Sequence, residues 1–164
     1  MAATLPQVSH EHHTRLIHQV DLMPATGDLI GTAPIAELRP RIDEMSTFLT
    51  SLLIPHMEAA EANIYPELDR IFENRQSMAP MRREHAEIRQ LVADLGHLRD
   101  GLDQGRLQTG EAVTLRRLVF RLYALLKVHL AEEELYIGIV EKGISAESAA
   151  SVAAAMQHAG MTTS

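Results

Sequence analysis

The chain has 164 residues, 46% of them hydrophobic, and a formal net charge of −7 at pH 7. This length and composition fit a single domain over residues 1–164, and the negative charge argues against a general nucleic-acid surface. Cysteine is absent, which excludes disulfides and thiolate metal sites. Any metal must therefore be held by imidazole and carboxylate groups.

No apolar run is long enough to predict a membrane span. Residues 1–9 are too short and too polar for a signal peptide. We therefore expect a cytoplasmic protein with neither a membrane nor a nucleic-acid partner. The acidic composition and the alanine-rich end of the chain are compatible with a monomer or a homodimer.

Apolar residues recur at helical spacing, and glycine and proline gather between the periodic segments. The pattern predicts helices at about residues 9–23, 34–72, 80–103, 109–143 and 145–160. Pro24 should end the first helix, and a link with a short turn at 28–30 should follow it. Pro55 and Pro66 should kink or divide the second helix.

The predicted helices are joined by short links, and Thr109 can cap the fourth helix. Long helices with short links favour an all-α fold, an antiparallel up-down-up-down four-helix bundle. Its core should span about residues 9–143, and 145–160 should form a short C-terminal helix.

Four histidines lie on the core-facing stripes of four different predicted helices: His13, His56, His85 and His129. A lone histidine on such a stripe is usually a hydrogen-bonded core residue, because burying an unpaired imidazole is costly. Four of them on four helices instead favour a metal site inside the bundle. His12 competes with His13 for the first position, although it is rotated about 100° from the stripe.

A carboxylate accompanies the fourth histidine. Glu133 follows His129 by four residues, about 40° around the helix, so that both side chains can reach one ion. Metal-bound histidines usually need a partner for the far ring nitrogen, and Glu84 or Glu87 could supply one for His85.

The corresponding carboxylate in the first half of the chain is harder to place. Ala60 stands four residues after His56 and cannot bind a metal. On an ideal helix Glu61 lies about 140° from His56, and Glu58 lies about 160° from it on the other side. We favour Glu61, because the neighbouring prolines can distort the helix and a long side chain can swing towards the core.

Four segments in this order carry a family resemblance: His13-Thr-Arg-Leu-Ile, Leu53-Ile-Pro-His56 leading to Ile64-Tyr65-Pro66, Glu84-His85-Ala-Glu-Ile-Arg89 and His129-Leu-Ala-Glu-Glu133-Glu134. Together they resemble the hemerythrin-like, or HHE, cation-binding domains over roughly residues 9–143. The resemblance implies a four-helix bundle with a non-haem di-iron centre. Such a centre binds or senses oxygen, nitric oxide or peroxide.

The resemblance implies that the four histidines are terminal ligands and that Glu133 is a bridging ligand. With Glu61 included, the predicted metal ligands are His13, His56, Glu61, His85, His129 and Glu133. Two positions depart from the family pattern. Ala60 replaces the first-half bridging glutamate, and Arg89 stands where oxygen-carrying members place a further histidine.

These departures from the family pattern leave open two alternatives to an oxygen-binding di-iron protein. Without the bridge expected at Ala60, a single metal or a zinc ion could fix the helices of a structural or regulatory module. Without the histidine expected at Arg89, a coordination position is open, which suits a peroxide-consuming di-iron enzyme.

Overall fold

The computed structural model describes residues 5–102 and 107–161. These residues form α1 (Leu5–Leu29), α2 (Ile35–Phe48), α3 (Ile54–Ala59), α4 (Tyr65–Ile71), α5 (Ala79–Leu102), α6 (Thr109–Gly143) and α7 (Ala146–Met161). Two π-helical turns, η1 (Leu49–Leu53) and η2 (Ala60–Ile64), connect α2 to α3 and α3 to α4. Within the described ranges there is no strand, and the predicted all-α class is confirmed.

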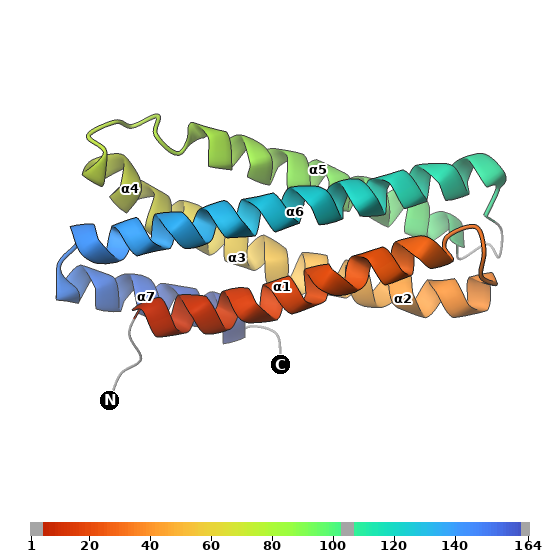
Figure 1. Cartoon of the computed structure of the whole chain (residues 1–164), viewed down its shortest axis with the longest axis horizontal. Coiled ribbons are helices and arrows are strands. Elements are labelled where there is room, and N and C mark those ends of the chain that lie inside the picture. The colour runs from red at the N-terminus through yellow and green to blue at the C-terminus, as the bar shows by residue number, and fades with distance from the viewer. Residues whose placement is uncertain (1–4, 103–106, 162–164) are drawn as a thin grey trace.

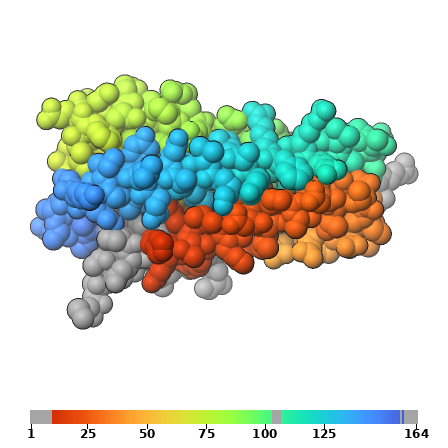
Figure 2. Space-filling view, in the orientation of Figure 1, coloured from red at the N-terminus to blue at the C-terminus, as the bar shows by residue number. Residues whose placement is uncertain are grey.

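The helices form an antiparallel bundle, as predicted. In Figure 1, α1 and α5 run one way along the long axis, while α6 and the segments from α2 to α4 return. α1 and α6 pack along each other and form the face seen in Figure 2. α7 packs on α1 and α3. No helix in the described part of the chain is both long and apolar enough to cross a membrane.

The prediction that the first helix ends at Pro24 is wrong, because α1 continues to Leu29. A proline inside a helix removes one backbone hydrogen bond and crowds the preceding turn. The apolar stripe nevertheless continues past the proline, since Met23 and Ile30 are both buried. Packing of this stripe against the bundle outweighs the local cost, so the predicted turn at 28–30 lies mainly within the helix.

The predicted long second helix is divided near both prolines. Pro55 and Pro66 occupy the first turns of α3 and α4, where a missing backbone N–H is tolerated. Each π-helical turn ends two residues before one of these prolines. A π-helical turn accommodates an extra residue and is wider than an α-helical turn. It therefore makes room for the proline ring and rotates the residues that follow.

The long helix α6 begins one residue earlier than the predicted cap implies. Gln108, and not Thr109, is the N-cap residue, and it forms a reciprocal capping box with Glu111. The Glu111 side chain accepts a hydrogen bond from the Gln108 backbone N–H at 2.9 Å. This satisfies donors that a helix start otherwise leaves unpaired.

The apolar core has two clusters with a polar layer between them. On α6, Leu126 and Leu130 belong to one cluster, and Ile137 and Val140 belong to the other. Glu133 lies between these pairs and is itself fully buried. The bundle therefore surrounds its polar layer with apolar packing on both sides.

Candidate metal centre

The four predicted histidines converge in the polar layer from four different helices. His13 comes from α1, His56 from α3, His85 from α5 and His129 from α6, and all four are buried. Their ring nitrogens form two groups, each completed by Glu133. One group contains His13 and His56 and the other contains His85 and His129, with the ligand atoms of each group within 4.8 Å of one another.

The first group lies around one oxygen of Glu133. Oε2 of Glu133 is 2.7 Å from Nε2 of His56 and 3.2 Å from Nε2 of His13. Burial alone would raise the pKa of Glu133, but His56 and the hydrogen bond from His13 hold it well below its usual range. Glu133 is therefore an anion in a fully buried position.

The second group lies on the other side of the same carboxylate. Nε2 of His85 is 3.0 Å from Nε2 of His129 and 3.1 Å from the hydroxyl oxygen of Tyr65. That hydroxyl donates to Oε1 of Glu133 at 3.3 Å. Oε2 of Glu133 thus lies beside the imidazoles of the first group, while Oε1 accepts from the tyrosine that contacts His85 of the second group.

Carboxylates outside the cluster hold the far nitrogens of three histidines. Nδ1 of His13 is 2.6 Å from Glu134, Nδ1 of His85 is 2.6 Å from Glu61, and Nδ1 of His129 is 2.9 Å from Glu84. A carboxylate accepts the Nδ1 hydrogen and fixes the ring so that Nε2 faces inwards. This is the usual support of a metal-bound histidine.

The donor set fits a metal ion. Burial lowers the pKa of His85 to about 4, so its ring is neutral at neutral pH. Because Nδ1 of His85 donates its hydrogen bond to Glu61, Nε2 of the neutral ring carries a lone pair. The Nε2 of His129, whose Nδ1 is held by Glu84 in the same way, faces it at 3.0 Å. Each ring can therefore offer its Nε2 lone pair to one shared cation.

The structure places Glu61 and Glu58 outside both groups. Glu61, predicted as a ligand, bonds instead to the far nitrogen of His85 and to Arg89. The Glu58 side chain is exposed. Ala60 is buried among apolar residues. Among the described residues of the first half of the chain, none therefore contributes a carboxylate to either group.

The carboxylates that hold the histidine rings also differ from those expected from the sequence. Glu84 bonds to His129 and not to His85, while Glu87 pairs with Arg121 on the surface. These partners lie on neighbouring helices, which spacing within one helix cannot predict. Glu134, which the sequence analysis does not single out, holds His13.

His12 and His13 are equally buried but differ in their contacts. His13 lies between Glu133 and Glu134, and although burial alone would lower its pKa, these two carboxylates raise it. Both ring nitrogens of His12 have no partner within the described residues, and burial with nearby His56 lowers its pKa to about 3. The geometry therefore favours His13 as the residue that faces the cluster.

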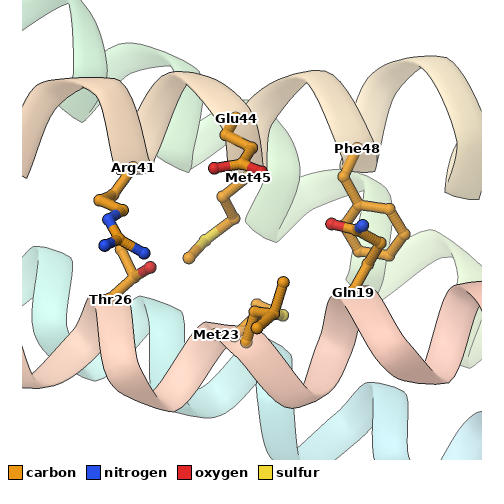
Figure 3. A pocket seen from close by; sticks show the side chains of 8 residues that line it. Gln19, Met23, Thr26, Arg41, Glu44, Met45 and Phe48 are labelled. Carbon is orange, nitrogen blue, oxygen red and sulfur yellow. The ribbon is translucent and has the colours of Figure 1, made fainter.

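A cleft between α1 and α2 lies apart from the histidines (Figure 3). Its volume is about 80 Å³. It is lined by Gln19, Leu22, Met23, Thr26, Arg41, Glu44, Met45 and Phe48. None of the cluster residues lines this cleft, so it adds nothing to the chemistry of the candidate metal centre.

A buried set of imidazoles that shares one carboxylate inside a four-helix bundle defines the class of histidine–carboxylate metal-binding bundles. The family model described as Hemerythrin HHE cation binding domain matches residues 7–140. The chain belongs to this family of metal-binding helical domains. No significant match was found among curated proteins or among solved structures. The matched region ends before α7 begins at Ala146.

Proposed function

We propose that this protein is a non-haem di-iron protein that binds or senses oxygen, nitric oxide or peroxide. The observation that carries the proposal is the position of Glu133, which belongs to both groups of imidazoles and is bonded through Oε2 to His56 and through Oε1 to Tyr65. One carboxylate shared by two sets of imidazole nitrogens is suited to bridging two ions. The ligand identities themselves stay a prediction.

The donors and their burial support a small ligand. Imidazole and carboxylate suit iron and zinc, and the chain has no cysteine to offer a softer site. His56, His85, His129 and Glu133 are all fully buried. A bound iron pair supplies coordination and redox chemistry. Because these side chains are fully buried, a small ligand suits the cluster better than a large substrate.

The test is elemental analysis of protein purified without added metal, with a visible absorption spectrum of the same sample. We expect about two irons per chain and absorption from an oxo-bridged pair. Glu133→Gln should lose most of this iron, because it removes the shared charge. Glu132→Gln, at the exposed neighbouring position, is the matched control and should keep it.

A colourless protein with about one zinc per chain would contradict the di-iron proposal. That result would instead support the alternative in which one metal fixes the helices of a structural or regulatory module. In the iron-loaded protein, addition of nitric oxide or azide should change the visible spectrum. An unchanged spectrum would argue against binding of a small ligand.

A second candidate function is peroxide consumption. Arg89 pairs with Glu61 outside the cluster, so that the group of His85 and His129 has two imidazoles. The resemblance places a further histidine in this group, and its absence leaves a coordination position at which peroxide could react. The iron-loaded protein should then consume hydrogen peroxide faster than the same concentration of free iron. Equal rates would reject this candidate.

A further inference from the structure

We infer that Tyr65 is a further metal ligand, whose phenolate oxygen binds at the position that His85 and His129 share with Glu133. The inference rests on the proposed function, because it requires a metal at that position. It adds a residue type that the histidine–glutamate pattern of the family does not include.

The position of the hydroxyl is the first support. Tyr65 is fully buried. Its oxygen lies 3.1 Å from Nε2 of His85 and 3.3 Å from Oε1 of Glu133, and both of these atoms belong to residues of one group. An oxygen that contacts two converging donor atoms already lies beside the point at which those donors meet. A small movement would therefore bring it to a shared ion.

The π-helical turn η2 explains why this tyrosine faces the cluster. Tyr65 follows His56 by nine residues, which on an ideal α-helix would place the two side chains about 180° apart. The turn at Ala60–Ile64 lies between them and accommodates an extra residue. Counted as eight α-helical steps, the separation falls to about 80°. The local distortion thus directs the phenol inwards.

Neighbouring side chains hold the ring in place. The Tyr65 ring stacks on His85, with ring centroids 5.4 Å apart and an angle of 26° between the planes. The Arg82 guanidinium lies 5.5 Å from the centre of the Tyr65 ring. A ring that is fixed on these contacts needs little reordering to bind a metal.

The charge of the site is the second support. Ala60 removes the carboxylate that the family resemblance places in the first half of the chain, which leaves Glu133 as the anion shared by both groups. A phenolate restores one negative charge and one hard oxygen donor, which suit a ferric ion. On binding, the metal–oxygen bond replaces the O–H bond, and the proton is released to solvent without electron transfer.

The experiment compares ferric-loaded wild-type protein, Tyr65→Phe and the control Tyr136→Phe by visible absorption and resonance Raman spectroscopy. Tyr136 is partly buried and packs against the apolar cluster that contains Ile137 and Val140. We expect a phenolate-to-iron charge-transfer band with enhanced tyrosine ring modes in wild-type protein and in Tyr136→Phe. Tyr65→Phe should lose both signals.

Titration with zinc gives a second readout that does not depend on iron chemistry. Zinc binding should produce the ultraviolet difference spectrum of a deprotonated tyrosine in wild-type protein but not in Tyr65→Phe. Wild-type protein that holds two irons without either tyrosinate signal would overturn the inference and leave the di-iron proposal intact. Protein that takes up neither iron nor zinc would overturn both.

Discussion

Arg89 donates a hydrogen bond from Nη2 to Oε1 of Glu61 at 3.0 Å. The same oxygen lies 2.6 Å from Nδ1 of His85. Arg89, which the resemblance places where oxygen-carrying members have a histidine, is thus connected to the cluster through Glu61, and both side chains are about one third exposed. Arg89 therefore helps to orient His85 from outside and does not itself reach the proposed ions.

Replacing Glu61 should weaken metal binding without removing a ligand. In Glu61→Ala, the His85 ring loses the partner of its far nitrogen, and loss of such a partner typically lowers metal affinity about 10–100-fold. We expect the saturated protein to hold as much iron as wild-type protein. Competition with a chelator measures the affinity, and Glu58→Ala is the exposed control. A fall in the saturated metal content would show instead that Glu61 is a ligand.

The adjacent residues His12 and His13 provide a matched pair on α1, because each is 2% exposed. His13→Ala should lower the metal content, since Nε2 of His13 is 3.2 Å from the shared carboxylate Glu133. His12→Ala should keep the metal content, since neither of its ring nitrogens has a partner among the described residues. Elemental analysis of the two variants decides between them. The opposite pattern would make His12 the first ligand.

Much of the candidate site follows from helical spacing alone. His13, His56, His85 and His129 each share a stripe with apolar neighbours on the same helix, so the sequence shows which face they occupy. Glu133 follows from its spacing of four residues from His129. The convergence of these residues could be predicted because each position depends on local geometry within a regular helix, while their role as ligands stays a prediction.

Predictions that depend on other helices or on irregular turns are less successful. The bond between His13 and Glu134 joins residues far apart in the chain, which no local pattern reveals. The contacts of Tyr65 with His85 and Glu133 could not be placed from spacing, because nine residues on a regular helix would turn this side chain away from His56 and the sequence does not show the π-helical turn. Pro24 is misjudged because tertiary packing overrides its local preference to end a helix.

Asp69 should stabilise the start of α5 in a pH-dependent manner. It accepts hydrogen bonds from the Ser77 hydroxyl at 2.6 Å and the Met78 N–H at 3.2 Å, and it pairs with Arg82. Burial alone would raise its pKa, but these contacts lower it below the ordinary value of 3.8. The contribution to stability is therefore present above that value and is lost as pH falls through the lower, folded-state pKa.

Asp69→Asn should accordingly lower the free energy of unfolding by about 1–2 kcal/mol near neutral pH. The difference from wild-type protein should shrink in acid, where both side chains are uncharged. Urea denaturation of both proteins with a chelator present measures this effect. Asp100→Asn, at an exposed position, is the control. A difference that stays constant with pH would show that charge is not the cause.

Two glycines inside helices should respond in opposite ways to alanine. A Cβ atom on Gly27 would lie 2.8 Å from the ring of Phe120, whereas a Cβ on Gly96 would meet nothing within 4 Å. Gly96→Ala should stabilise the protein by about 0.5–1 kcal/mol through helix propensity. Gly27→Ala should destabilise it, because overpacking typically costs about 1–3 kcal/mol. Thermal unfolding compares them, and equal melting temperatures would contradict the predicted contact.

The sharing of Glu133 has a consequence for how the proposed di-iron protein would fill with metal. An ion bound by His13 and His56 would fix the rotation of the carboxylate and so present its other oxygen to the second group. Loss of that ion would free the carboxylate to rotate and would weaken the binding of the remaining ion. Binding and loss of the two ions should therefore be cooperative, so that few molecules hold a single ion. The fraction of fully loaded protein would then change steeply with the concentration of iron.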